Sequence, residues 1–101
     1  MNEYLISPKE LQTLLMTNAD IQLIDVRTAD KHQDFNIGGQ LIPTQTLPEH
    51  IHELDPNKLT ITYCTRGGNS MRALQYLVSI GFKQVKSLDG GMTRWREEIE
   101  A

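Results

Sequence analysis

Short apolar segments alternate with segments of helical pattern along the whole chain, and this alternation restricts the fold more than any other feature. Strands are expected over 4–6, 21–24, 41–42, 59–63 and 85–88. Helices are expected between them, starting at Pro8, running from Thr28 to about Phe35, over 48–54 and 70–80, and in a last segment that contains Trp95. Such alternation favours a parallel sheet with right-handed crossovers. We therefore expect an α/β fold in three layers, α/β/α, with about five mostly parallel strands and helices on both faces.

Local signals mark several of these boundaries. Ser7 and Glu10 have the spacing of a capping box, and Pro8 between them is tolerated in a first helical turn. Pro43 stops the third strand, and Gly81 suits the left-handed end of the helix over 70–80. The element order therefore rests on helix and strand ends as well as on apolar spacing.

The length and composition suit one globular domain. The chain has 101 residues, and we expect a single domain over 1–101. It is 39% hydrophobic and 23% charged, which is ordinary for a folded protein. No apolar run approaches the roughly 20 residues that span a bilayer, and the first residues lack the pattern of a signal peptide. The expectation is a soluble, cytoplasmic protein with no membrane partner and with the monomer as its default state.

The charge is distributed unevenly. The net charge is −3, which argues against a nucleic-acid partner. The segment 56–88 nevertheless contains no Asp or Glu, and it holds five basic residues: Lys58, Arg66, Arg72, Lys83 and Lys86. One interpretation is a chance clustering of surface charges. The other is a local positive potential around Cys64, which lies inside this segment and would act on an anion.

Cys64 is the one cysteine of the chain. A single cysteine forms no internal disulfide, no Cys-x-x-Cys redox pair and no thiolate metal cluster. A free cysteine without chemistry is usually a small buried apolar residue. His50 and His52 are two residues apart on an expected helix and point to different faces, so together with His32 they predict no metal site.

Two expected strands end in residues that carry chemistry. Asp25-Val26-Arg27 ends one strand, and Tyr63-Cys64 ends another, so both should emerge at the carboxyl rim of a parallel sheet. Cys64 then opens a loop between a strand and a helix: Cys64, Thr65, Arg66, Gly67, Gly68, Asn69 and Ser70. Its glycines allow backbone N–H groups to point inward as an anion nest, and the helix dipole and Arg66 add positive potential. All three effects favour a thiolate at Cys64.

The spacing of this loop argues against a tyrosine phosphatase. Such an enzyme needs an Arg six residues after the Cys to clamp the phosphate, and Ser70 stands there instead. The next arginine is Arg72. Backbone amides, a small hydroxyl and Arg66 fit a small sulfur-bearing anion or a persulfide better than a phosphate.

Taken together, these motifs resemble the rhodanese family over nearly the whole chain. The matching residues are Asp25-Val26-Arg27, the segment Ile37–Pro43 with Gly39 and Ile42, the Cys-x-x-Gly-x-x-Ser pattern of Cys64, Gly67 and Ser70, and the C-terminal set Gly81-Phe82, Val85, Leu88, Gly90-Gly91-Met92 and Trp95. The cysteine loop is moderately specific alone, and the C-terminal set makes the resemblance strong.

The resemblance implies a single-domain thiosulfate sulfurtransferase. In that family the cysteine takes the outer sulfur of thiosulfate or another persulfide donor and passes it to cyanide or a thiol, including a thiol of an acceptor protein. Carried over by position, Cys64 is the nucleophile, the amides of 65–69 hold the persulfide and the leaving anion, Arg66 attracts the donor and Ser70 holds the loop. No cofactor or metal is implied, since the persulfide itself carries the sulfur.

Asp25, Arg27 and Arg72 are supporting residues in this interpretation. Asp25 is expected to be buried and to pair with Arg27 or to cap a loop amide, whereas Asp30 is another candidate partner for Arg27. For Arg72, a place at the site and a solvated place are both open.

The chain also departs from the family pattern in several places. Asn36 stands in place of a His, Phe35 in place of a Gly, Lys31-His32 in place of an acidic-aromatic pair, and Asn69 in place of a frequent Arg. The missing loop cation leaves the preferred donor open. A low-turnover persulfide carrier or regulatory binding module is therefore an alternative, and arsenate reduction is a further one because it uses the same thiolate chemistry.

Overall fold

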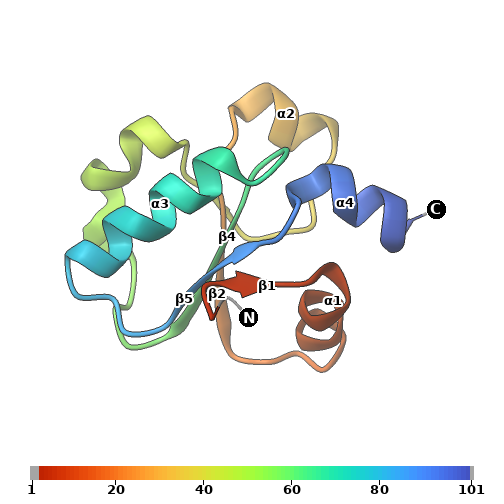
Figure 1. The fold of residues 1–101 in the computed structure, drawn as a ribbon. Coiled ribbons are helices and arrows are strands. Elements are labelled where there is room, and N and C mark those ends of the chain that lie inside the picture. The colour runs from red at the N-terminus through yellow and green to blue at the C-terminus, as the bar shows by residue number, and fades with distance from the viewer. Residues whose placement is uncertain (1–2, 101) are drawn as a thin grey trace.

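A computed structural model describes residues 3–100 of the chain (Figure 1). The elements are, in order, β1 (Leu5–Ile6), α1 (Pro8–Met16), β2 (Ile21–Asp25), α2 (Ala29–Asp34), β3 (Gln40–Leu41), the 3-10 helix η1 (Thr44–Glu53), β4 (Leu59–Tyr63), α3 (Gly68–Ser79), β5 (Val85–Leu88) and α4 (Gly91–Glu98). Strands and helices alternate as the sequence predicts.

The five strands form one sheet in the order β1-β5-β4-β2-β3, and every neighbouring pair is parallel. The longest pairing joins β2 to β4, from Ile21 opposite Leu59 to Asp25 opposite Tyr63. β1, the first strand in the chain, lies at one edge of the sheet, whereas β4 and β5 lie inside it. Because neighbouring strands are parallel, long crossover connections must join them. The predicted α/β fold with a parallel five-stranded sheet is confirmed.

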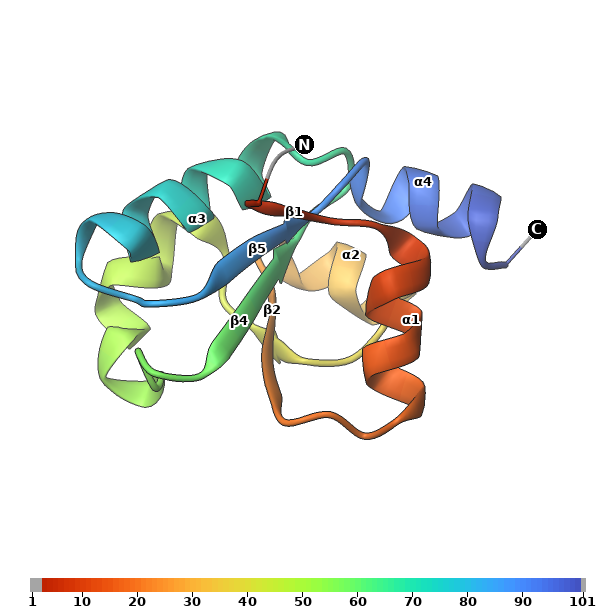
Figure 2. The same cartoon turned by 60° about the horizontal axis from the view of Figure 1, so that its bottom comes forward.

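Helices cover both faces of the sheet (Figures 1 and 2). The helices α3 and η1 lie on one face, over a cluster that includes Ile24, Leu74 and Leu77. The helices α1 and α4 lie on the other face, over a cluster that includes Ile61 and Trp95. The short helix α2 follows β2 at the rim, and none of its residues is buried.

The central strand β4 has a different character on each face. Ile61 and Tyr63 point into the cluster under α1 and α4 and are completely buried. Thr60 and Thr62 alternate with them and are equally buried. The hydroxyl of Thr62 donates to the carbonyl of Ser70 at 2.9 Å, so a polar residue of the strand ties down the first turn of α3.

Two helices begin earlier than the sequence predicts. The helix expected over 48–54 is a 3-10 helix that begins at Thr44 and includes Pro48. Both the N–H and the hydroxyl of Thr46 donate to the carbonyl of Pro43, which closes a tight turn four residues upstream of the expected start. The helix expected from Ser70 begins at Gly68, because the N–H of Met71 already donates to the carbonyl of Gly67.

Candidate active site

The carboxyl ends of β2 and β4 bring the two chemistry-bearing segments together. Asp25 and Tyr63 are register partners, and the N–H of Val26 donates to the carbonyl of Tyr63 at 3.0 Å. Cys64 therefore leaves the sheet beside Val26 and Arg27. The shared rim expected from the sequence is present in the structure.

Backbone and side-chain groups of the following loop surround the sulfur of Cys64. The N–H of Gly67 donates to Sγ at 3.0 Å, and the N–H of Ser70 donates to it at 3.3 Å. The hydroxyl oxygen of Ser70 lies 3.4 Å from Sγ. Gly67 adopts φ +109, in the left-handed region, which turns its N–H toward the sulfur and starts α3. Two backbone N–H donors therefore converge on one sulfur atom, and a third polar group, the Ser70 hydroxyl, lies beside it.

The start of α4 supports this loop from behind. The N–H of Met92 donates to the carbonyl of Cys64 at 2.8 Å, and the N–H of Thr93 donates to that of Thr65 at 2.9 Å. Gly91, at φ +59, lies so close that a Cβ there would be 2.5 Å from the carbonyl oxygen of Cys64. The unpaired N–H groups of one helix thus hold the carbonyls of the cysteine loop.

Cys64 is 4% exposed and opens into a cavity of about 640 Å³. The loop residues Thr65, Arg66, Gly68 and Asn69 line the cavity together with the two residues after β2 and with residues of α2, η1 and α3, whereas Ser70 is buried beneath the loop. Arg72 also lines it, and its guanidinium donates to the side-chain oxygen of Asn69 at 3.3 Å. Arg72 therefore lies at the edge of the cavity with its side chain exposed to solvent, so it combines the two places left open by the sequence.

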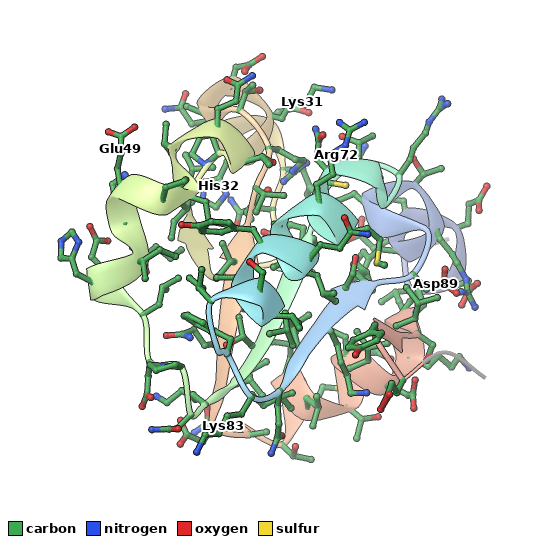
Figure 3. The ribbon with its side chains drawn as sticks, turned by 60° about the vertical axis from the view of Figure 1, so that its left-hand side comes forward. Lys31, His32, Glu49, Arg72, Lys83 and Asp89 are labelled. Carbon is green, nitrogen blue, oxygen red and sulfur yellow. The ribbon has the colours of Figure 1, made fainter. Side chains whose placement is uncertain are left out.

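The charge around this cavity has one sign. Arg27, Lys31, Arg66 and Arg72 line it, and no acidic side chain of residues 3–100 does. Figure 3 shows Lys31 and Arg72 at the same end of the molecule, with Lys83 at the opposite end. An anion entering the cavity therefore meets positive charge from α2, the loop and α3, whereas Arg27 is paired with Asp25.

The acid-free segment predicted this charge only in part. Arg66 and Arg72 come from it, whereas Lys58 forms an ion pair with Asp20 at 3.1 Å and Lys86 donates to a backbone carbonyl near the N-terminus. Two further cations of the cavity lie outside the segment. Only two of the four basic residues that line the cavity, Arg66 and Arg72, therefore come from the acid-free segment.

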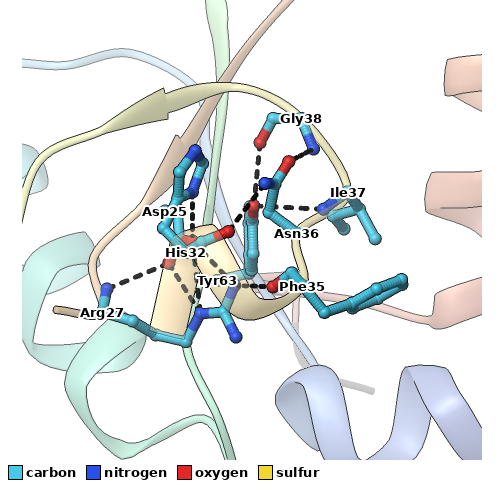
Figure 4. Close-up of polar contacts among 8 residues, drawn as sticks. All are labelled: Asp25, Arg27, His32, Phe35, Asn36, Ile37, Gly38 and Tyr63. Atoms are coloured by element: carbon cyan, nitrogen blue, oxygen red, sulfur yellow. Dashed lines mark hydrogen bonds and ion pairs between the residues drawn. The ribbon is translucent and has the colours of Figure 1, made fainter. Parts of the chain in front are cut away.

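A buried ion pair fixes the end of β2 beside the cavity (Figure 4). The carboxylate of Asp25 is completely buried and accepts hydrogen bonds from the Arg27 guanidinium, at 2.8 to 3.2 Å, and from the Arg27 N–H at 3.0 Å. Nδ1 of His32 lies 2.8 Å from the same carboxylate. Burial alone would raise the pKa of Asp25, but the hydrogen bonds from Arg27 and His32 together lower it below its usual value. The partner of Arg27 is thus Asp25 rather than Asp30.

Tyr63 connects this ion pair to the segment after α2. Its hydroxyl donates to the carbonyl of Gly38 at 2.8 Å and accepts from the N–H of Ile37 (Figure 4). Burial, together with the nearby Asp25 carboxylate, raises the pKa of Tyr63 to about 12, so the phenol keeps its proton. Asn36 closes the same segment by donating to the carbonyl of His32 and accepting from the N–H of Gly38.

The sequence did not assign a site role to three residues that the structure places here: Lys31, His32 and Ser87. Lys31 and His32 had a visible signal, since they replace the acidic-aromatic pair of the rhodanese pattern. Ser87 had none beyond its place in the strand expected over 85–88. It is completely buried, and its Oγ lies 2.7 Å from Oγ of Ser70.

Within residues 3–100, no group of three or more His, Cys, Asp or Glu side chains has the arrangement of a metal site. His50 lies against Glu53 at 2.8 Å, and His32 lies against Asp25. Across the same residues, no helix has the length and apolar character needed to cross a bilayer.

Comparisons with known proteins match this arrangement. The family model of the rhodanese-like domain matches residues 7–98. The thiosulfate sulfurtransferase GlpE of Coxiella burnetii is 35% identical over 83 residues, which cover 81% of this chain and 78% of the relative. The thiosulfate sulfurtransferase GlpE of Stutzerimonas stutzeri is 34% identical over 97 residues, which cover 95% of this chain and 88% of the relative.

Solved structures share the fold. A rhodanese-like domain protein from Staphylococcus aureus superimposes with a TM-score of 0.80 at 28% identity, over 89% of this chain and 88% of that one. The human single-domain sulfurtransferase superimposes with a TM-score of 0.83 at 21% identity, over 96% and 98% of the two chains. The chain belongs to the rhodanese-like domain family, and its curated relatives above are named thiosulfate sulfurtransferases.

Proposed function

We propose that this protein transfers sulfane sulfur through a persulfide on Cys64, with thiosulfate as a donor. The Cys64 thiolate attacks the outer sulfur of thiosulfate, a new S–S bond forms, and the S–S bond of thiosulfate breaks. Sulfite leaves with the electron pair of that bond, and the enzyme keeps a Cys64 persulfide anion. The total charge is the same before and after this step, so no external oxidant or proton is needed.

The observation that carries the proposal is the convergence of two backbone N–H donors on Sγ at the base of a cavity without acidic side chains. The amides of Gly67 and Ser70 stabilise negative charge on sulfur, and the Ser70 hydroxyl oxygen, 3.4 Å away, is close enough to join them once the thiol has lost its proton. In this proposal the remaining amides of the loop hold the outer sulfur and the leaving anion. A preorganised set of backbone donors costs no reorganisation during the reaction.

The cations of the cavity have a second role in this proposal, which is to attract the donor. Thiosulfate carries two negative charges, and Lys31, Arg66 and Arg72 have exposed side chains that line the cavity. Arg27 is bound by Asp25 and contributes mainly to the shape of the wall. Asn69 stands where an arginine is frequent in the family, and Lys31 supplies a cation from α2 instead.

The second half-reaction returns the enzyme to its starting state. Cyanide or a thiolate attacks the outer sulfur of the persulfide, and the S–S bond breaks with its electrons on Cys64. The products are thiocyanate or a new persulfide on the acceptor. A lone cysteine suits this scheme, because the acceptor discharges the persulfide and no resolving cysteine is needed.

The direct test is to incubate the reduced protein with thiosulfate and to measure the intact mass without reductant. We expect a gain of one sulfur atom, localised to Cys64 by peptide mapping and removed by cyanide with release of thiocyanate. Cys64→Ser should show neither result, while keeping the far-ultraviolet circular dichroism of the wild type. A wild-type protein with a free thiol that gains no sulfur from thiosulfate would contradict the assignment of the donor.

The size of the cavity supports a second candidate, a carrier that takes sulfur from a larger persulfide. A volume of about 640 Å³ lies in the range of sites for drug-sized molecules and far exceeds what the five heavy atoms of thiosulfate fill. In this case thiosulfate turnover should be slow, whereas an organic persulfide or a protein persulfide should load Cys64 rapidly. Comparing the two loading rates on the same protein separates the candidates.

A further inference from the structure

A buried serine on β5 stands behind the residue that contacts the sulfur. Ser87 is completely buried, as is Ser70, and their hydroxyl oxygens are 2.7 Å apart. The Ser70 oxygen is in turn 3.4 Å from Sγ of Cys64. Ser87, Ser70 and Cys64 therefore form a continuous polar chain from an inner strand of the sheet to the sulfur atom.

The number of protons decides how this chain is oriented. A serine hydroxyl has one proton to donate and two lone pairs. Ser70 has three neighbours for these groups: Ser87 Oγ, Cys64 Sγ and the carbonyl oxygen of Gly67 at 3.2 Å. When Cys64 is a thiol, its S–H donates to Ser70, and the Ser70 proton points to the Gly67 carbonyl. A thiolate only accepts, so in that state the Ser70 proton turns to the sulfur.

The Ser87 hydroxyl has fewer hydrogen-bond partners than the Ser70 hydroxyl. Among the contacts of residues 3–100, the Ser87 side chain bonds to Ser70 Oγ alone, and it is closed to water. Buried hydroxyl protons are almost always placed on an acceptor, so the Ser87 proton goes to Ser70 Oγ. The Ser70 hydroxyl then does not donate to Ser87, and its proton remains available to the carbonyl oxygen of Gly67 or to the sulfur of Cys64.

We infer that Ser87 is a positioning residue, which directs the Ser70 hydroxyl toward the Cys64 thiolate. Ser87 does not touch the sulfur. It acts by occupying one lone pair of Ser70 and by polarising the Ser70 O–H bond, which strengthens the hydrogen bond to an anion. The inference rests on the proposed role of Cys64 as the nucleophile, and it adds a residue from β5 to the groups that favour its thiolate.

The test measures the thiolate without any sulfur donor. The rate of Cys64 alkylation by iodoacetamide at neutral pH follows the thiolate population. We expect Ser87→Ala to lower this rate by about 2- to 10-fold, the range of one hydrogen bond. Ser70→Ala should lower it at least as much. The double variant should be no slower than Ser70→Ala alone, because Ser87 acts only through Ser70.

Two further variants separate positioning from general loss of structure. Ser87→Thr keeps the hydroxyl and should be alkylated faster than Ser87→Ala. Thr60→Val removes another fully buried hydroxyl of the same sheet, at the end of β4 away from Cys64, and should leave the alkylation rate unchanged. Urea titration of each variant shows whether it is folded under the assay conditions.

The inference is overturned if Ser87→Ala is folded and alkylated at the wild-type rate, or if the losses of the two serine variants multiply in the double variant. Failure of thiosulfate as a donor would leave these alkylation results unchanged. The two outcomes can therefore be told apart, because alkylation reports on the thiolate and the mass gain reports on sulfur transfer.

Discussion

Gly91→Ala should damage the cysteine loop through backbone contact alone. Gly91 is the first residue of α4, and a Cβ there would lie 2.5 Å from the carbonyl oxygen of Cys64 and 2.6 Å from the carbonyl carbon and oxygen of Thr65. Carbon atoms without a bond between them prefer separations of about 3.5–4.0 Å. All three neighbours are backbone atoms, so no side-chain rotation relieves the contact, and the loop must move away from α4.

The cost can be worked out from two contributions. A left-handed φ of +59 costs a residue with a Cβ about 1–2 kcal/mol relative to glycine. Overpacking against fixed atoms costs about 1–3 kcal/mol. The free energy of unfolding should therefore fall by about 2–5 kcal/mol, out of the roughly 5–15 kcal/mol typical of a domain. The protein should still fold, with the hydrogen bonds from α4 to the loop lengthened.

Gly81→Ala is the matched control for the backbone contribution. Gly81 also has a left-handed φ, of +101, but a Cβ there meets no atom within 4 Å. It follows α3 at the other end from the loop, so its substitution should cost stability without changing the rate of sulfur transfer. Any loss of activity in Gly91→Ala beyond this control comes from the displaced loop.

The assays are urea unfolding and the initial rate of thiocyanate formation from thiosulfate and cyanide, measured where each variant is folded. Displacement of a reacting group by about 1 Å can cost about 100-fold in rate, and we expect a loss of that order for Gly91→Ala. A Gly91→Ala protein as stable as Gly81→Ala, and as active as the wild type, would refute the steric argument and the role assigned to α4.

Two further predictions concern charge. Asp25→Asn should lower the free energy of unfolding by about 3–5 kcal/mol in urea titrations, because it leaves the largely buried Arg27 guanidinium without its counter-charge. The pKa of Asp25 is lower in the folded protein than in the unfolded chain, where it is about 3.9. The stability that the Asp25 carboxylate contributes is therefore fully present above the unfolded pKa. It is lost as the pH falls through the folded pKa. Urea titrations at descending pH should show a smaller acid-dependent loss in Asp25→Asn than in the wild type, and equal slopes would contradict the assignment. Lys31→Gln and Arg72→Gln should each raise KM for thiosulfate by about 1.5- to 5-fold, the range for an exposed charge pair, with an effect that fades at high salt. Lys83→Gln, far from the cavity, should leave KM unchanged, and an equal rise in all three would show a general charge effect instead.

Much of the fold was predictable because its signals are local. Apolar spacing, the capping box at Ser7 and the glycine after α3 depend on residues close in the chain, and the structure confirms the resulting elements. The expected first residues of η1 and α3 were too late by four and two residues, respectively. There the deciding hydrogen bonds come from carbonyls of Pro43 and Gly67, which a propensity pattern does not reveal.

The candidate site was predictable to the extent that it follows from topology. Parallel strands put Asp25 and Cys64 at one rim, and the glycine-containing loop after Cys64 indicated amides directed at the sulfur. The sequence did not show which amides reach it, and the structure identifies those of Gly67 and Ser70. The structure also adds a source of positive charge at the cavity that the sequence did not predict, because Lys31 lies in α2 and not in the acid-free segment.

The sequence by itself determined the order of elements, the parallel sheet, the rim that carries Cys64 and the family. Only the tertiary structure decided which side chains complete the site, because these meet across long separations in the chain. Ser87 of β5 lies within hydrogen-bond distance of Ser70 in α3, and Gly91 at the start of α4 packs against the carbonyl of Cys64. Local pattern depends on neighbours in sequence, whereas hydrogen bonds and close packing depend on distances of a few ångströms that only the folded chain sets.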